Sequence, residues 1–342
     1  MDYIIEQLKN LMAIDSPSGF TEKAALYVMR ELEGMGYEPV LNRKGGVLVE
    51  LGGKGNPLVL SAHIDTLGAM VAEVKSDGRL RLTPVGGLQP SNAETENCRV
   101  YTRSNGVIGG TMQLINASVH VNKEYSSKPR NYDTVEVILD EKAFSKEETE
   151  KLGISVGDFV CFDTRTVITE SGFIKSRFLD DKLSVAILLG YAKRLKDTGS
   201  KLNRKVYMLV TPYEEVGHGG AAFIPEDAEE MLCVDMGCVG EGLSCDEFKV
   251  SICAKDSVGP YDYHVTGELI RRAQAKGIDY AVDVYPYYGS DADAALSAGH
   301  CLRHGLIGAG VYASHGYERA HKEGVKNTLE LIHAYTVDEE YI

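Results

Sequence analysis

The sequence lacks features that would assign it to several other classes of protein. None of its seven cysteines stands in a C-x-x-C pair, so neither a zinc knuckle nor a disulfide framework is indicated. No apolar run is long enough to cross a membrane, and no cationic stretch precedes an apolar segment at the N-terminus as in a standard signal peptide. Free thiols suit a reducing compartment, so we expect a cytoplasmic protein.

Positive charge is also scarce in this chain. Lys and Arg number 36 against 50 Asp and Glu, which gives a formal net charge of −14. A surface this acidic repels nucleic-acid phosphates and anionic lipids, so neither a nucleic-acid nor a membrane partner is expected. Most of the surplus carboxylates face solvent, and the remainder are available to bind cations.

The length of 342 residues exceeds that of one compact core, since a domain has about 150 residues on average. The continuous apolar segment Leu58–Ala62 is typical of a buried, parallel strand. After Leu67 the pattern changes to short alternating strands with a hairpin turn at Asp77-Gly78, and an α/β pattern returns at Asp180. We therefore predict an α/β domain formed by residues 1–67 and 169–342, with residues 68–168 inserted as a small β-rich domain.

Metal-binding types of side chain follow the predicted strands of the α/β domain. In open α/β sheets, ligands bind beyond the carboxyl ends of the strands. Each short motif is a weak signal alone, but the convergence of five on one sheet edge by chance is improbable. The motifs are His63-Ile64-Asp65, Asp180-Asp181 at the start of a helix, Glu214-Glu215, Asp235 and His315.

The chemistry of this set indicates a pair of metal ions. Imidazole and carboxylate ligands without thiolates suit Zn²⁺, Co²⁺ or Mn²⁺. Two ions roughly 3.5–4 Å apart form the usual hydrolytic pair, and a carboxylate can bind one ion with each of its oxygens.

Taken in order, the motifs resemble the tetrahedral (TET), glutamyl and deblocking aminopeptidase family of dinuclear metallopeptidases. The resemblance covers essentially the whole chain. It implies a three-layer α/β/α zinc-peptidase-like sandwich with an inserted small β-barrel-like domain that serves assembly and substrate access. The matching stretches are Ser61–Asp65, Leu179–Lys182, Glu214–Gly217, Val234-Asp235 and Gly289–Ala292, with Ser18-Gly19 and Leu152–Asp158 in addition.

The resemblance also implies the role of each site residue. One ion would be bound by His63, Asp180 and Asp235, and the other by Asp180, Glu215 and His315, so that Asp180 is the bridge. Asp65 would orient His63 by accepting its other N–H. Glu214 would be the general base, and the Asp180-Asp181 peptide bond would be cis.

The implied activity is removal of N-terminal residues from short peptides. The two ions would acidify a bridging water, Glu214 would take its proton, and the hydroxide would attack the scissile carbonyl. Family members form twelve-subunit particles, so we expect a homo-oligomer, either a dodecamer or a smaller assembly built from dimers.

Three positions depart from the family pattern. His218 and Gly219 follow Glu-Glu-Val-Gly where an apolar residue and a basic one are usual, and Gly316 follows His315 where Ser or Thr is usual. His321, six residues later, is the alternative last ligand. The family's Asp-x-x-Gly-Asn is replaced by Asn42–Gly46.

Other functions remain open at this point. A related dimetal carboxypeptidase or a deacylase of N-acyl amino acids would use a similar site. A glycosidase built on Glu214 and Glu215 is disfavoured, because adjacent side chains of an extended chain point apart. A non-catalytic assembly or binding protein would not need the full set of ligands.

Overall fold

The computed structural model describes residues 1–337, which form two compact units. The first unit comprises Met1–Asp65 together with the chain from Arg165 onward, and the second comprises Thr66–Thr164. Within the described residues, no helix is both long enough and apolar enough to cross a bilayer.

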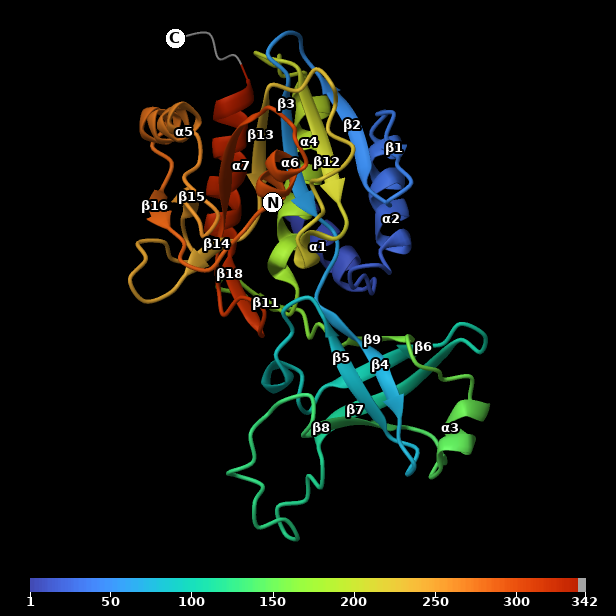
Figure 1. Ribbon diagram of the computed structural model, residues 1–342. Helices are drawn as coiled ribbons and strands as arrows, with labels where there is room; N and C mark the ends of the chain where they lie inside the picture. The colour runs from blue at the N-terminus through green and yellow to red at the C-terminus, as the bar shows by residue number, and fades with distance from the viewer. Residues whose placement is uncertain (338–342) are drawn as a thin grey trace. The chain divides into compact units, whose positions relative to one another are not determined.

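A twelve-stranded mixed sheet, counted over residues 1–337, forms the centre of the first unit (Figure 1). Its main path runs β1-β2-β12-β3-β13-β17, and β15 and then β16 continue beyond β17. A smaller branch of β18, β11 and β10 starts from the end of β17, beside which β14 also pairs. The strands are β1 (Val40–Leu41), β2 (Val47–Gly52), β3 (Leu58–His63), β10 (Val167–Ile168), β11 (Phe173–Ser176), β12 (Val206–Thr211), β13 (Glu230–Val234), β14 (Gly237–Val239), β15 (Val250–Lys255), β16 (Tyr280–Val284), β17 (Arg303–Tyr312) and β18 (Glu318–His321).

The centre of the sheet is parallel, as the apolar runs predicted. Strand β3 is buried at all six positions and pairs in parallel with β12 on one side and β13 on the other. Strand β17 also runs parallel to β13. Since parallel strands end at the same edge, the segments that follow β3, β12 and β13 meet there.

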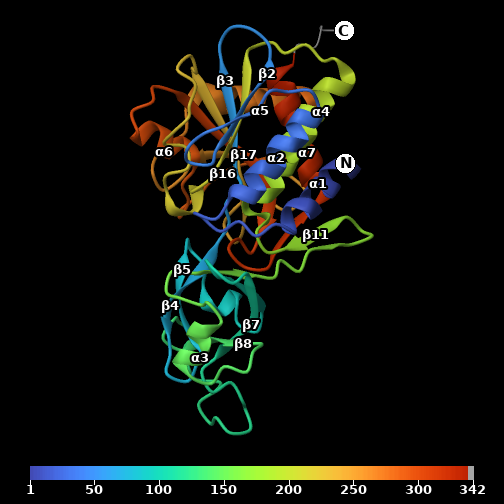
Figure 2. The same ribbon diagram turned by 90° about the vertical axis from the view of Figure 1, so that its right-hand side faces the viewer.

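Helices cover both faces of this sheet, which gives the three-layer α/β/α arrangement that was predicted. Helices α4, α5 and α7 contact one face and α6 contacts the other, with α6 visible on the opposite side from α4 in Figure 2. The helices of the unit are α1 (Asp2–Met12), α2 (Glu22–Gly34), α4 (Leu179–Thr198), α5 (Tyr263–Lys276), α6 (Asp291–Ser297) and α7 (Lys322–Thr336).

Helix α4 is the central helix of the first layer, because α1, α2 and α7 all pack against it. Most of its side chains are buried, including Leu183, Ile187 and Leu189, as expected of a helix without a solvent face. Helix α1 approaches so closely that a Cβ at Gly190 would collide with Ile4. Thr21 precedes α2, but its side chain makes no capping hydrogen bond.

The second unit is a closed six-stranded barrel, all of whose residues the structure describes. The strand order is β4-β5-β8-β7-β6-β9, so the predicted β-rich segment closes on itself and leaves no open sheet edge. Its one α-helix, α3 (Lys146–Lys151), begins after Ser145, whose side chain accepts from the Glu148 N–H. The strands are β4 (Gly68–Val74), β5 (Leu80–Val85), β6 (Asn97–Tyr101), β7 (Val107–Leu114), β8 (Val135–Leu139) and β9 (Phe159–Phe162), with a 3₁₀ turn η1 (Pro90–Asn92).

Candidate metal centre

Side chains from five segments of the first unit gather beyond the carboxyl ends of its parallel strands. The sequence predicted this edge because apolar runs there end in carboxylates and imidazoles. The side chains are His63 at the end of β3, Asp180 in the first turn of α4, Glu214 and Glu215 in the 3₁₀ turn η2 (Glu214–Val216) after β12, Asp235 directly after β13, and His315 between β17 and β18.

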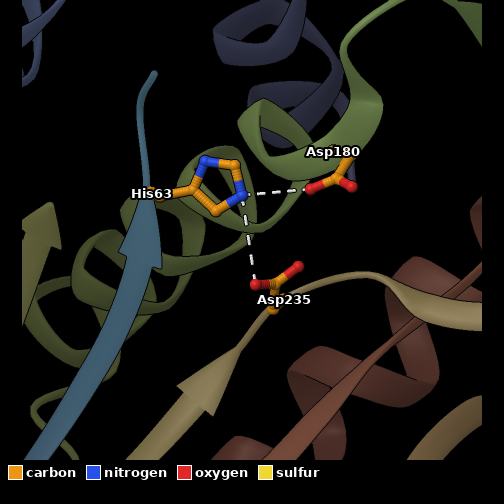
Figure 3. Close-up of side chains that lie close together, drawn as sticks. All are labelled: His63, Asp180 and Asp235. Atoms are coloured by element: carbon orange, nitrogen blue, oxygen red, sulfur yellow. Dashed lines mark hydrogen bonds and ion pairs between the residues drawn. The ribbon is translucent and has the colours of Figure 1, made fainter. Parts of the chain in front are cut away.

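The first cluster is centred on His63 and is shown in Figure 3. Its Nε2 lies 3.0 Å from Oδ1 of Asp180 and 3.9 Å from Oδ2 of Asp235. The opposite nitrogen, Nδ1, lies 2.9 Å from the main-chain oxygen of Asp65 and donates its proton there, because a carbonyl oxygen can only accept. The lone pair of Nε2 therefore faces carboxylate oxygens, an arrangement that needs either a second proton or a cation between them.

Without a cation between them, a proton on Nε2 would satisfy these carboxylate oxygens. Burial by itself would lower the pKa of His63, but the hydrogen bonds to Asp180 and Asp65 raise it well above its ordinary value. A divalent cation bound between Nε2 and the carboxylates would replace that proton. This cluster therefore has the donor atoms and the charge that a metal site requires.

The second cluster is centred on His315. Its Nε2 lies 3.5 Å from Oδ2 of Asp180 and 3.5 Å from Oε2 of Glu215. The two carboxylate oxygens of Asp180 are thus divided, with Oδ1 near His63 and Oδ2 near His315. Each trio offers ligand atoms that all lie within 4.8 Å of one another.

The carboxyl groups of the two clusters carry more negative charge than their burial favours. Burial and the charge of Asp180 raise the pKa of Asp235 to about 7 and that of Glu215 well above its ordinary value. Among the described residues, Oε1 of Glu215 is also buried without a hydrogen-bond partner. A buried acceptor that lacks a donor is costly, and a cation would satisfy it. The residues present therefore fit divalent metal.

Asp65 connects the His63 cluster to the turn that carries the two glutamates. Besides accepting from His63 through its main-chain oxygen, it accepts from the N–H groups of Glu214 and Glu215 at 3.1 and 3.3 Å through its carboxylate. The Ser18 hydroxyl donates to the same carboxylate. The resemblance implied that the Asp65 side chain orients His63, whereas its Oδ1 is 3.5 Å from Nδ1 and the carbonyl oxygen is closer.

The conformation of Glu214 and Glu215 differs from the extended one that the sequence predicted. The two residues do not end a strand in extended conformation, because β12 stops at Thr211 and the glutamates form a 3₁₀ turn. Their separation comes from the turn, which places Glu214 Oε2 3.7 Å from His63 Nε2 and Glu215 beside His315. The argument against a glycosidase from alternating strand directions therefore does not hold for this segment.

Glu318 is a buried residue of the site that no sequence motif indicated. Its Oε2 accepts from the main-chain N–H of Asp180 at 3.1 Å, and its Oε1 accepts from that of His315 at 3.0 Å. One side chain thus fixes the spacing between the shared carboxylate and the second imidazole. Glu318 opens the four-residue strand β18, which has no apolar run to draw attention to it.

The structure brings His315 and not His321 to the cluster. Nε2 of His321 lies 2.8 Å from the main-chain oxygen of Ser171, and its Nδ1 accepts from the N–H of Glu323 as the cap of α7. Both ring nitrogens of His321 are therefore engaged elsewhere.

The Asp180-Asp181 and Gly289–Ala292 motifs both form hydrogen bonds to the segments that carry the site. The Asp180-Asp181 peptide bond is cis, as expected, and Oδ2 of Asp181 accepts from the main-chain N–H of His63 at 3.1 Å. Asp291, at the start of α6, accepts from the Thr211 hydroxyl and from the N–H of Gly220. A Cβ at position 219 would collide with the Asp291 carboxylate, which accounts for the glycine found there.

Comparison of the sequence with known proteins finds aminopeptidases. The profile of the M42 glutamyl aminopeptidase family matches residues 45–331. The protein named "Putative aminopeptidase YhfE" of Bacillus subtilis is 44% identical over 333 residues, which cover 97% of this chain and 96% of that one. A protein of Acetivibrio thermocellus named "Putative aminopeptidase" is 25% identical over 338 residues, covering 96% and 97% of the two chains.

Comparison of the fold points the same way. A solved structure of the TET1 peptidase of Pyrococcus horikoshii superposes with a TM-score of 0.85 and covers 98% of this chain and 100% of that chain. The sequence identity of this pair is 24%, so the likeness establishes the fold. That peptidase is described as able to assemble into a tetrahedron or a large octahedral shell.

Proposed function

Because the chain belongs to the M42 glutamyl aminopeptidase family, we propose that it removes N-terminal residues from short peptides with the help of two divalent metal ions. One ion would be held by His63, Asp180 and Asp235, and the other by Asp180, Glu215 and His315. Imidazole and carboxylate donors of this kind favour zinc, with cobalt or manganese as alternatives.

The observation that carries the proposal is the division of the Asp180 carboxylate between two imidazoles. Oδ1 faces His63 and Oδ2 faces His315, at 3.0 and 3.5 Å. One carboxylate that faces two separate sets of donors suits a bridging ligand of two ions. A single ion would leave one set of buried charges uncompensated.

The chain itself would supply the proton transfers. Metal ions of this kind, when bound, lower the pKa of water and stabilise negative charge on a carbonyl oxygen. Glu214 belongs to neither trio of ligands, yet its carboxylate lies 3.7 Å from His63 Nε2. It can therefore accept a proton from the attacking water and deliver it to the nitrogen of the leaving peptide. Asp65 would hold Glu214 in place through the N–H that it accepts.

Elemental analysis with a substrate panel tests this function. We expect two divalent ions per chain, hydrolysis of peptides with a free N-terminal amine, and loss of that hydrolysis in chelator. Full activity in stringently metal-free protein would refute the proposal. Cleavage only from the C-terminus would indicate a carboxypeptidase, and cleavage only of N-acylated amino acids a deacylase. Metal binding without hydrolysis of any of these substrates would indicate a binding or assembly protein.

We also propose that the barrel unit, assigned by sequence to residues 68–168, serves assembly and substrate access. The tetrahedral assembly of the Pyrococcus horikoshii peptidase supports a homo-oligomer, either twelve subunits or a smaller assembly built from dimers. A closed shell would admit short peptides and exclude folded proteins. Sedimentation of the protein only as a monomer of 37.3 kDa would refute this part of the proposal.

A further inference from the structure

A cavity of about 370 Å³ lies in the first unit beside the turn that carries Glu214. Its walls come from the start of α2, from the turn between β1 and β2, and from Tyr213, the residue before Glu214. None of the five proposed metal ligands lines it. The cavity is therefore distinct from the metal clusters but adjoins the segment of the proposed base.

The order of the strands places Glu214 between this cavity and part of the metal-ligand set. Strand β12, which leads to Glu214, lies between β2 and β3 (Figure 1). The turn before β2 lines the cavity, whereas Asp235 and His315 follow β13 and β17 on the other side of β3. A base that protonates the leaving nitrogen must be within hydrogen-bond reach of it. The leaving peptide therefore starts at Glu214, and the cavity lies on the side away from Asp235 and His315.

The charge of the cavity is opposite to that of the whole chain. Three cationic residues, Lys23, Arg43 and Lys44, line it with one acidic residue, Glu22. The chain as a whole has a net charge of −14. A positive concave site in an acidic protein attracts anionic groups selectively.

Lys44 is held in position by its surroundings. The side chain of Asn42 accepts from the main-chain N–H groups of Lys44 and Gly46 at 2.9 and 2.7 Å, which fixes the turn. The Lys44 ammonium donates to the main-chain oxygen of His218 and lies 5.5 Å from the ring centre of Tyr213, which stacks on the His218 ring. A lysine ammonium has three donors, so a bond to one carbonyl leaves donors for a ligand.

We propose that this cavity binds a carboxylate on the leaving part of the substrate, with Lys44 as its principal partner and Arg43 as a second. The inference rests on the proposed function and adds a preference on the leaving side of the scissile bond. The carboxylate is either the C-terminus of a very short peptide or an acidic side chain next to the cleaved bond. In both cases a charge-assisted hydrogen bond to Lys44 would favour the substrate.

Three tripeptides with the same N-terminal residue test the proposal on the metal-loaded protein. They are X-Gly-Gly with a free C-terminus, X-Gly-Gly amide, and X-Asp-Gly amide, where X is the N-terminal residue cleaved best. We expect wild-type kcat/KM to be roughly tenfold higher for at least one carboxylate-bearing peptide than for X-Gly-Gly amide. The peptide that shows the preference identifies which carboxylate is bound.

Variants of the lining residues then test which side chain causes the preference for a carboxylate. The measured quantity is the ratio of kcat/KM for the preferred peptide to that for X-Gly-Gly amide. Lys44→Gln should reduce the ratio to near one, Lys44→Arg should restore much of it, and Arg43→Gln should lower it by a smaller factor. Lys54→Gln removes an exposed charge beyond the far end of β2 and should leave the ratio unchanged.

Two outcomes would overturn the proposal. One is equal cleavage of all three peptides by wild type. The other is an equal loss on every peptide in Lys44→Gln, which would show that Lys44 only positions Tyr213 and His218. In either case hydrolysis of X-Gly-Gly amide would leave the aminopeptidase function standing, whereas no cleavage of any peptide would count against that function itself.

Discussion

The two candidate metal-binding clusters share Asp180 but differ in their exposure to solvent. The side chain of His63 is 1% exposed, whereas that of His315 is 39% exposed. His63 is the last residue of a fully buried strand, and His315 lies in a connection whose backbone is held by Glu318. We therefore expect an ion at His63 to be retained and an ion at His315 to exchange more readily with solvent. One carboxylate can thus face a slowly exchanging and a readily exchanging ion at the same time.

Replacing the shared residue Asp180 should affect metal binding at both clusters, so that they no longer differ. Because Asp180 faces both imidazoles, Asp180→Asn should abolish the binding of both ions. It should also lower kcat/KM by roughly 10⁴-fold or more. Elemental analysis and peptide hydrolysis measure the two effects. Asp197→Asn, at an exposed position near the end of the same helix, is the matched control and should retain both. Retention of one ion by Asp180→Asn would show that the clusters are independent.

Glu214 should affect chemistry without affecting either ion. Glu214→Gln keeps the shape of the side chain but removes the proton acceptor, so kcat should fall by ~10²–10⁴-fold with both ions retained. Turnover and metal content are measured on the same sample. Loss of an ion in this variant would place Glu214 among the ligands and remove it as the proposed base.

Glu215 and Asp235 should each affect one cluster only. Glu215→Gln should lower the affinity for the ion beside His315 by roughly 10–100-fold, and excess metal should partly restore activity. Asp235→Asn should instead lower the affinity for the ion beside His63. Metal titration of both variants, followed by calorimetry, distinguishes the two positions. If Glu215→Gln keeps full occupancy while Glu214→Gln loses an ion, the roles of the adjacent glutamates are reversed.

The smallest expected effect concerns the stability of the metal-free protein. The pKa of buried Asp235 is raised to about 7, while an unfolded Asp titrates near pH 3.9. Between these values the folded state binds more protons than the unfolded state, so the free energy of unfolding falls as pH rises from about 4 to about 7. We expect Tm in chelator to fall by about 5 °C from pH 5 to pH 8.

Two controls test whether the fall of Tm with pH comes from the buried carboxylates around His63. Asp235→Asn cannot titrate at this position and should show a shallower fall in Tm. Saturating zinc should remove most of the fall, because bound metal compensates the ionised carboxylates. An identical slope in wild type and Asp235→Asn would assign the pH dependence to other groups.

The elements that were predicted well are those with long apolar runs. Leu58–Ala62 lacks a solvent-facing side, which only a buried parallel strand accommodates, and the structure has β3 there. A side chain that directly follows such a strand has a defined place at the sheet edge. His63 and Asp235 could therefore be predicted to converge.

The features that were missed depend on turns and on main-chain acceptors. The 3₁₀ turn at Glu214-Glu215 leaves no periodic pattern, so extended geometry was assumed for it. Glu318 acts by accepting N–H groups of Asp180 and His315, and nothing in a single sequence shows which backbone groups a glutamate will meet. Lys44 was visible only as part of a departure from the family pattern, and its place beside Tyr213 required the fold.

The dispersal of the proposed ligands along the chain has a consequence for how the protein is made. His63 lies before the inserted barrel, Asp180 after it, and His315 in one of the later connections of the fold. During synthesis from the N-terminus, four of the five ligand segments emerge while the second imidazole is still absent. A growing chain can therefore assemble at most the His63 cluster. The newborn protein would acquire its second ion, and with it the ability to cut peptides, only after nearly all of its sheet has been translated.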